Sequence, residues 1–297
     1  LGIGDVNQHY DCIHIPNMGG YAFPSENMLS CKNIILGPSG IDEVIYGEEV
    51  FFDKSLWKIH EPLIQKEILR WPKNIEKISA VHVVANSELN EMNQYLKIPK
   101  EKMTVIHNGF DESLYHLKKW SYVDEFFVLG FVGRYDPVKN FPLLVALVDQ
   151  LLCAGYKIKA YVAGRGYSNE LLEELASRPE VIGAIELKGQ VDRMSDFYQE
   201  VDLLLVTSFS EGFPNVICEA ALSGVDCLSF DVGEVSAILP SENIIKDRNA
   251  EVILEQIKSR LVNTGMNLGA QVRARMLGRF SIQSTAEKYE MVYQRSI

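Results

Sequence analysis

The sequence predicts an α/β protein with two domains, each built on a parallel sheet, and three observations support this. The chain has 297 residues with 47% hydrophobic content, which is enough to bury two cores. Apolar runs of strand length alternate with segments of helical period, a pattern typical of βαβ units. A polar, aperiodic segment at residues 118–124 separates two such series. We therefore predict one domain at residues 1–120, a second at 121–281, and a terminal helix at 282–297.

The first domain has few predicted elements. Ser87 is a typical N-cap for a helix that ends at about Leu96. The sequence Asn108-Gly109 indicates a tight turn. The other elements are an amphipathic helix at 57–69 and strands at 11–15, 33–36, 80–85 and 103–106. Opening strands are missing from this series and the chain begins with Leu1, so we expect an incomplete amino-terminal domain.

The second domain is predicted to be a complete Rossmann-like domain. Its predicted strands are 126–132, 158–163, 184–187, 203–206 and 227–230. The predicted helices are 142–152, 168–176, 194–200 and 214–223, with two more that begin at 251 and at about 282. We expect the parallel sheets of the two Rossmann-like domains to face each other across a cleft, with ligands at the carboxyl ends of the strands.

Composition and charge argue against several classes of function. The formal net charge of -11 disfavours nucleic acid as a partner, because such proteins need a basic face. A local basic patch would still allow peripheral membrane association. The six histidines have no ligand spacing, so we expect no metal site. Scattered cysteines without a CxxC pair indicate reduced thiols in the cytoplasm; they are Cys12, Cys31, Cys153, Cys218 and Cys227.

A first polar group follows the opening strand of the second domain. Gly133 has no Cβ, so a ligand can approach the backbone closely. Arg134 and Lys139 place two positive charges at the carboxyl edge of the sheet. Asn140 is placed to cap the next helix, and Pro142 lies in its first turn, so the positive end of that helix is nearby. This arrangement suits a diphosphate. The alternative is an ordinary loop with solvated cations.

A second polar group follows the fourth strand of the same domain. Glu211 lies in the turn, and a helix opens at Pro214, so the amides of Asn215 and Val216 form another anion site. Glu219 lies within that helix on roughly the same side. Each carboxylate can accept hydrogen bonds from vicinal sugar hydroxyls. The alternative, a turn residue and a surface residue, is weakened because apolar neighbours surround Glu219 and an unpartnered carboxylate there would be costly.

Together the two groups resemble glycosyltransferase family four (glycosyl transferases group 1), which has the GT-B fold. The motifs are Gly-Arg-x4-Lys-Asn at 133–140 and Ser-Glu-Gly-Phe-Pro-Asn at 210–215, with a second Glu eight positions after the first. The resemblance covers residues 126 to the end and, more weakly, 80–111. It implies a retaining enzyme with no metal and no cofactor besides its nucleotide-sugar co-substrate. In agreement, the chain contains no Asp-x-Asp. The resemblance also implies that the terminal helix crosses back to the first domain.

The resemblance implies roles for individual residues. Arg134 and Lys139 would hold the donor diphosphate and stabilise the leaving group. Glu211 would bind hydroxyls of the donor sugar, and Glu219 would bind the ribose. Residues 187–191 would flank the nucleobase. The other donor-binding residues on this reading are Gly133, Gly189, Val191, Phe213, Pro214, Asn215 and Val216.

The sequence departs from the family's pattern in two regions. Similar proteins often have Gly-Gly-x-x-Glu after the fifth strand; here Glu234 replaces the second Gly and Ala237 the later Glu, which affects the wall near the donor sugar. In the first domain, residues 37–40 stand where a His is common, and a glycine-rich acceptor loop is absent. Residues 164–166 form a partial GxGxxG, which we interpret as a tight turn and not as a dinucleotide site.

The sequence therefore predicts a cytoplasmic hexosyltransferase, with attachment to the inner face of the membrane left open. Its donor would be a UDP- or GDP-sugar and its acceptor a sugar, lipid or protein. One alternative is a nucleotide-sugar epimerase or hydrolase on the same fold, which would form product without an acceptor. The other is a non-catalytic fragment that only binds a nucleotide sugar.

Overall fold

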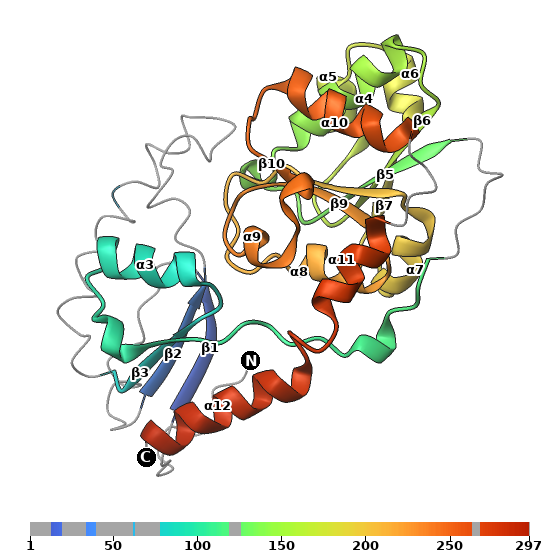
Figure 1. The fold of residues 1–297 in the computed structure, drawn as a ribbon. Helices are drawn as coiled ribbons and strands as arrows, with labels where there is room; N and C mark the ends of the chain where they lie inside the picture. Colours follow the sequence, from blue (N-terminus) through green and yellow to red (C-terminus); the bar gives the residue numbers. More distant parts are fainter. Residues whose placement is uncertain are drawn as a thin grey trace. The chain divides into compact units, whose positions relative to one another are not determined.

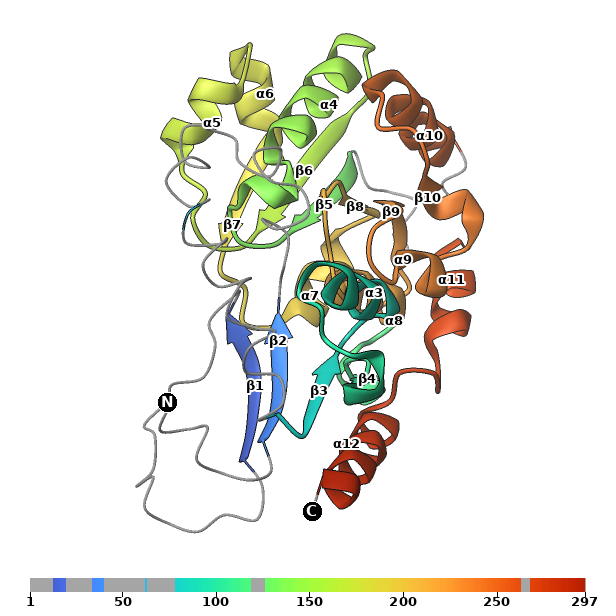
Figure 2. The ribbon, with the colours of Figure 1, turned by 90° about the vertical axis from the view of Figure 1, so that its left-hand side faces the viewer.

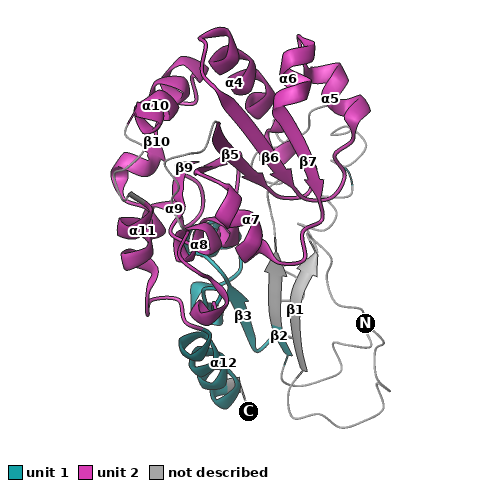
Figure 3. Ribbon diagram, turned by 90° about the vertical axis from the view of Figure 1, so that its right-hand side faces the viewer, with its two compact units in different colours: residues 1–109, 282–297 teal, residues 110–281 magenta. Residues whose placement is uncertain are grey.

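The computed structural model describes residues 13–19, 34–39, 62, 78–118, 126–262 and 268–296. The chain divides into two compact units, one with the residues up to Gly109 and from Ile282 on, the other with Phe110–Ser281 (Figure 3). Apart from residue 62, the helix predicted at 57–69 lies outside the described residues, as does most of the predicted linker. Within the described ranges, no helix has both the length and the apolar composition needed to cross a membrane.

The second unit is built on a six-stranded parallel sheet with the strand order β10-β9-β8-β5-β6-β7 (Figure 1). The strands are β5 (Phe127–Val132), β6 (Ile158–Ala163), β7 (Ile185–Gly189), β8 (Leu203–Val206), β9 (Asp226–Phe230) and β10 (Ile244–Ile245). β8 and β9 are buried along their whole length, as expected for parallel strands covered on both faces. The strand order changes direction between β5 and β8. In open α/β sheets, ligands bind at the carboxyl ends of the strands beside such a point.

Helices form two groups around this sheet, and Figure 1 shows the strands between them. One group contains α4 (Phe141–Cys153), α5 (Asn169–Leu175), α6 (Pro179–Ala184) and α10 (Ala250–Val262). The other contains α7 (Met194–Glu200), α8 (Asn215–Leu222), α9 (Val235–Ile238) and α11 (Leu268–Met276). Short 3-10 helices are η5 (Glu112–Leu114), η6 (Pro137–Lys139) and η7 (Ser241–Asn243). α4 shows why these segments are helical, because its apolar residues recur at helical spacing and are buried on one side.

The predicted strands and helices of the second domain are confirmed, with bounds that agree to within two residues. The prediction omitted β10, α6, α9 and α11. α6 has six residues and α9 has four, so neither is long enough to display a helical period in the sequence.

The first unit contains a four-stranded parallel sheet with the order β1-β2-β3-β4 (Figure 2). Its strands are β1 (Ile13–Gly19), β2 (Ile34–Ser39), β3 (Ala80–Val83) and β4 (Met103–Val105). The terminal helix α12 (Ile282–Ser296) belongs to this unit. Val292 packs into a buried cluster with Ile35 and Ile106, and the Tyr289 ring meets His82 edge-on at 5.2 Å between centroids. These contacts attach the end of the chain to the first sheet.

Two local predictions in the first unit are wrong. Helix α3 (Asn86–Tyr95) begins before Ser87, and its N-cap, Ala85, has no side-chain bond. Instead, the carboxylate of Glu88 reaches back and accepts from Val84 N at 2.9 Å, which satisfies a backbone donor at the helix start. Asn108-Gly109 forms no turn. A Cβ on Gly109 would lie 2.7 Å from Ile282 Cα, so the glycine permits a close approach to the start of α12.

The contacts divide the chain after Gly109, earlier than the predicted boundary at residue 120. The segment that follows packs with the second unit. Lys118 Nζ donates to Val201 O at 2.7 Å, and Gln199 Nε2 donates to His116 O at 2.8 Å. These side chains bind backbone carbonyls across the fold, a contact that composition alone did not indicate.

Candidate functional site

Glycines bring the loops that follow β5, β6 and β7 into close contact at the carboxyl edge of the large sheet. Gly133 N donates to Ala163 O at 2.9 Å, and Gly164 N donates to Gly189 O at 2.8 Å. A Cβ on Gly164 would lie 1.7 Å from Gly133 O, so no other residue fits there without a shift. The φ angles of Gly164 and Gly166 are +151° and +90°. These values favour glycine, and the backbone bends sharply at residues 164–166, where the sequence indicated a tight turn.

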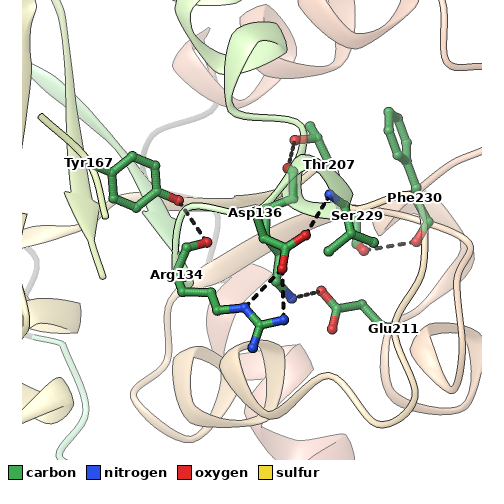
Figure 4. Close-up of polar contacts among 9 residues, drawn as sticks. Arg134, Asp136, Tyr167, Thr207, Glu211, Ser229 and Phe230 are labelled. Carbon is green, nitrogen blue, oxygen red and sulfur yellow. Dashed lines mark hydrogen bonds and ion pairs between the residues drawn. The ribbon is translucent and has the colours of Figure 1, made fainter. Parts of the chain in front are cut away.

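Asp136 organises the turn after β5. Its carboxylate accepts from Val138 N at 3.1 Å, which caps η6, and it also accepts from Arg134 Nε at 2.9 Å. Figure 4 shows the guanidinium of Arg134 folded back onto Asp136, with Tyr167 donating to Arg134 O on the other side. The Arg134 side chain is 76% exposed, so its free edge faces solvent. Asp136 was given no role from the sequence, although Asp before Pro137 is a typical helix-start signal.

Lys139 and Glu211 form an ion pair between the loops after β5 and β8. Lys139 Nζ lies 2.7 Å from Glu211 Oε1, and the two side chains are only 21% and 14% exposed. Backbone bonds support the pair, since Phe209 N donates to Val138 O at 2.8 Å and Thr207 Oγ1 donates to Lys139 O at 3.2 Å. The structure therefore brings together two residues that the sequence assigned to separate polar groups.

The stem of the Lys139 side chain lies close to Gly133. A Cβ there would lie 3.3 Å from Lys139 Cε, so the absent side chain makes room for the lysine stem. Asn140 differs from its predicted role. It stands at the N-cap of α4, but its side chain makes no capping bond, and its backbone is left-handed with φ 58°. Asn tolerates this conformation better than most residues. Pro142 lies in the first turn of α4, as predicted.

The loop after β9 packs against the backbone of Glu211. A Cβ on Gly233 would lie 2.1 Å from Glu211 O, and its φ of +55° also favours glycine. Glu234 N donates to Gly212 O at 3.1 Å, and Glu234 is buried. The departure from the family's Gly-Gly pattern therefore falls on a residue whose backbone supports the glutamate-bearing turn.

The turn that carries Glu211 is anchored by an aromatic side chain. The Phe213 ring packs against Phe280 at 5.0 Å and Phe110 at 6.3 Å between centroids. Pro214 stands at the N-cap of α8. The hydrogen-bond ladder of α8 begins with Ile217 N, which donates to Pro214 O at 3.1 Å. The amides of Asn215 and Val216 therefore precede the first intrahelical bond, as expected at a helix start.

Glu219 has a different environment from Glu211. It is partly buried in α8, and Tyr198 Oη lies 3.1 Å from its Oε2. Burial raises the pKa of Glu219, and the bond from Tyr198 acts in the opposite direction. Burial raises the pKa of Tyr115 to about 12, with a further contribution from the charge of Glu219. Cys218 beside it is fully buried and belongs to the core.

The segment predicted to flank a nucleobase lies at the edge of the same sheet. Gly189 ends β7 with a φ of +64°, and the exposed residue Gln190 accepts from Arg165 Nε at 2.7 Å. Val191 is half-buried. Sequence reasoning gave no role to Arg165, Tyr167 or Tyr198. The described residues hold no group of three or more His, Cys, Asp or Glu side chains arranged for a metal ion.

Comparison with known sequences gives a consistent picture. Residues 127–263 match the sequence model of the family described as Glycosyl transferases group 1. The O-antigen biosynthesis glycosyltransferase WclY of Escherichia coli is 26% identical over 227 residues, which cover 69% of this chain and 59% of that protein. The capsular polysaccharide biosynthesis glycosyltransferase CapM of Staphylococcus aureus is 25% identical over 203 residues, with 65% and 51% covered. The matches thus span less than two thirds of these relatives.

Solved structures agree on the fold. Sucrose-phosphate synthase from Thermosynechococcus elongatus superposes with a TM-score of 0.73 at 16% identity, over 96% of this chain and 73% of that one. HepE of Anabaena in complex with UDP and glucose gives a TM-score of 0.70 at 16% identity, over 91% and 79%. The chain therefore has the GT-B fold of glycosyltransferases, and its second unit matches glycosyl transferases group 1.

Proposed function

We propose that this protein is a retaining, metal-independent hexosyltransferase of glycosyltransferase family four. It transfers a hexose from a UDP- or GDP-sugar to a sugar, lipid or protein acceptor. The observation that carries the proposal is the Lys139–Glu211 contact of 2.7 Å, which joins a cation and a carboxylate from two loops at the carboxyl edge of one sheet. A donor needs both kinds of group side by side, because its phosphates are anionic and its sugar offers hydroxyl donors.

The cations act on the donor diphosphate. Arg134 has a free guanidinium edge in solvent, and Lys139 lies beside the start of α4. When the bond from the sugar to the diphosphate breaks, negative charge grows on the departing β-phosphate. Fixed positive charges stabilise that charge, and they need no reorganisation during the step. In this proposal Arg134, Lys139 and the amides of Asn215 and Val216 supply the stabilisation that a divalent ion would otherwise give.

The carboxylates and glycines orient the donor. Glu211 accepts hydrogen bonds from hydroxyls of the transferred sugar, and Glu219 accepts them from the ribose. Gly133, Phe213 and Pro214 shape the backbone around the phosphates, while Gly189 and Val191 flank the base. Orientation matters because a retaining transfer needs the acceptor to approach the face of the sugar from which the diphosphate leaves. The relatives WclY and CapM are named for O-antigen biosynthesis and capsular polysaccharide biosynthesis, which supports a glycan acceptor. A place in the cytoplasm, at the inner face of a membrane, is part of the proposal.

The donor is identified by thermal shift with UDP, GDP, ADP and their sugars. A ligand at about 100 times its Kd raises the stability by about 2.7 kcal/mol, which a melting curve resolves. We expect UDP or GDP and the corresponding sugars to stabilise the protein, and ADP to do so less. No response to any nucleotide would contradict the proposal.

Substitutions then test the roles that the proposal gives to individual residues. Lys139→Ala and Glu211→Ala are each expected to weaken donor binding and to lower turnover by about 100-fold or more. Lys258→Ala, which removes an ion pair with Glu255 on α10, is the control and is expected to behave like the wild type. The proposal fails if both site variants bind and turn over the donor normally. Epimerised or hydrolysed donor without any acceptor would favour the alternative enzyme class.

A further inference from the structure

A buried tyrosine contacts the carboxylate of Glu219 from the neighbouring helix. Tyr198 lies in α7, and its side chain is fully buried. Its hydroxyl lies 3.1 Å from Glu219 Oε2 and 3.2 Å from Val216 O, both in α8. A phenol has one proton, so it donates to one of these acceptors at a time. A bond to an ionised carboxylate is the stronger of the two.

The surroundings of Glu219 give this contact its importance. Among the ion pairs of the described residues, Glu219 takes part in none, whereas Glu211 has Lys139 at 2.7 Å. The described groups that interact with Glu219 are Tyr198, Tyr115 and Cys218, all neutral at physiological pH because burial raises their pKa values. A partly buried carboxylate without a cation keeps its full capacity to accept hydrogen bonds from a ligand. It also depends on the one donor that it has.

We propose that Tyr198 is a positioning residue for the donor ribose. By donating to Oε2, it fixes the Glu219 side chain so that the carboxylate accepts from the ribose hydroxyls. This inference rests on the proposed function, because it takes Glu219 as the ribose-binding group. Tyr198 itself touches no ligand. Its effect is to select a ribonucleotide over a deoxyribonucleotide.

The selection follows from geometry. A carboxylate on a flexible glutamate samples several rotamers, and each ligand hydrogen bond must then also restrict it. A side chain already fixed by Tyr198 binds the hydroxyls without that loss. A ligand that lacks the hydroxyl gains nothing from the fixed carboxylate. Removing the phenolic hydroxyl should therefore weaken ribonucleotide binding and leave deoxyribonucleotide binding almost unchanged.

The first experiment uses Tyr198→Phe and titration calorimetry. The probes are UDP and 2′-deoxy-UDP, or GDP and 2′-deoxy-GDP if the donor screen selects guanine. For Tyr198→Phe we expect the ribonucleotide Kd to rise about three- to tenfold, the worth of one net hydrogen bond, with less than a twofold change for the deoxy form. Phe keeps the ring in the core, and the melting temperature and circular dichroism confirm that the variant is folded.

Tyr115→Phe is the matched control. Tyr115 interacts with Glu219 through its charge, but no hydrogen bond joins these two described residues. We therefore expect it to keep the wild-type preference for the ribonucleotide. Glu219→Gln serves as the reference for complete loss of the carboxylate. Its preference for the ribonucleotide over the deoxyribonucleotide should fall further than that of Tyr198→Phe.

The pH dependence of binding gives a readout that a purely structural role would not change. Burial raises the pKa of Glu219, and the Tyr198 bond lowers it. Ribose binding needs the ionised form, so it is present above this pKa and is lost as the pH falls through it. Without the phenol, the pKa of Glu219 rises further, and the acid loss of ribonucleotide binding should begin at a higher pH in Tyr198→Phe. In Glu219→Gln, the pH dependence of ribonucleotide binding should reflect only the titration of the nucleotide's phosphate.

The outcomes distinguish the positioning role of Tyr198 from the proposed function on which it rests. If Tyr198→Phe keeps both the wild-type preference and the wild-type pH profile, while Glu219→Gln loses the preference, the role of Tyr198 is wrong and the proposed function stands. If Glu219→Gln also keeps the preference, the ribose role of Glu219 is wrong, and the inference about Tyr198 falls with it. Equal weakening of ribo and deoxy forms in Tyr198→Phe would likewise overturn the proposal, because it would indicate a general loss of packing.

Discussion

The two ends of the six-stranded sheet both carry charged side chains, but these are used differently. At the amino end, Lys118 pairs with Asp202, and the two side chains are 4% and 11% exposed. Lys118 also donates to Val201 O, and Asp202 accepts from Val128 N at 2.8 Å. At the carboxyl end, Arg134 keeps most of its side chain in solvent. The amino-end charges are bound to fixed backbone groups, whereas the Arg134 side chain at the carboxyl end remains accessible to solvent.

This difference indicates how one sheet combines stability with binding. Buried charges need partners within the protein, and in the amino-end pair Val201 O accepts from Lys118 while Val128 N donates to Asp202. A second amino-end carboxylate is also held by the protein, since Asn243 Nδ2 donates to both Asp226 Oδ1 and Cys227 O at 2.6 Å and Arg260 Nε lies 3.5 Å from Asp226 Oδ2. Charges at the carboxyl end lie on loops held by backbone bonds and glycines. Changes at the amino end should therefore affect mainly folding, and changes at the carboxyl end mainly the reaction.

The largest expected effect is on stability, in Lys118→Ala. The substitution leaves the buried carboxylate of Asp202 without its cation, and breaking a buried pair costs about 3–5 kcal/mol. The free energy of unfolding is measured by urea denaturation monitored by circular dichroism. Lys258→Ala, in the more exposed pair with Glu255, is the control and should lose at most about 1 kcal/mol. Equal losses in the two variants would remove the distinction between the two ends.

The next effect is on turnover, in Arg134→Ala. Loss of a cation at the developing phosphate charge is expected to reduce kcat by about 100-fold. The unfolding free energy should change by less than about 0.5 kcal/mol, because the side chain is exposed. Arg193→Ala removes a guanidinium that is 75% exposed and paired with Asp196, so it is a close match for exposure and charge. If both arginine variants retain full turnover, Arg134 does not act on the donor.

A smaller effect is expected for Gly164→Ala, which tests whether the carboxyl-end loops are held rigidly. The new Cβ would lie 1.7 Å from Gly133 O, and the left-handed φ is unfavourable for alanine. We expect a loss of about 2 kcal/mol and weaker donor binding, because residue 133 must shift. Gly183→Ala is the control, since nothing lies within 4 Å of a Cβ there, and it should be neutral or slightly stabilising. An unchanged melting curve for Gly164→Ala would show that the loop adapts easily.

The smallest effect concerns pH and stability in Glu219→Gln. Burial raises the folded-state pKa of Glu219 above its ordinary value of 4.5. The stability contributed by this group is therefore fully present below about pH 4.5 and is lost as the pH rises through the folded-state pKa. Glu219→Gln avoids the loss, so its Tm should exceed the wild-type Tm by about 2–4 °C at neutral pH and converge with it in acid.

Differential scanning calorimetry from pH 4 to pH 8 measures that difference. Glu255→Gln provides the comparison for a glutamate side chain that is 73% exposed. A Glu219→Gln variant that is less stable than the wild type at neutral pH would contradict the expected direction. It would mean that the charged carboxylate has a partner that compensates for its burial.

Much of the second unit could be predicted because its physical causes are local. Apolar runs such as 203–206 are continuous, as buried parallel strands require, and they end at turns with polar residues. The motifs also placed Lys139 and Glu211 after two strands of one parallel sheet, and the structure shows that they form an ion pair. These inferences needed only the period of the pattern and the parallel arrangement of strands.

The remaining features depend on contacts between distant elements. Tyr198 and Glu219 are 21 positions apart on two helices. The spacing of residues within each helix does not indicate that these two side chains meet. The cap of α3 was predicted at Ser87, but the carboxylate of Glu88 reaches back to Val84 N instead. Asn140 was predicted to cap with its side chain, yet its left-handed backbone prevents this. Each of these cases was decided by conformation, which residue type alone does not fix.

The ion pair between Lys139 and Glu211 has a consequence for which small molecules bind at the proposed donor site. The ammonium group is already neutralised at 2.7 Å, so a free phosphate ion that approaches it must compete with a carboxylate held nearby. In the proposed donor complex, a nucleotide sugar meets both partners at once, with phosphate for the lysine and hydroxyls for the glutamate. An inorganic anion offers a partner for the lysine but no hydroxyl groups for the glutamate. On the proposed function, the pair therefore favours molecules in which a phosphate and a polyol are joined.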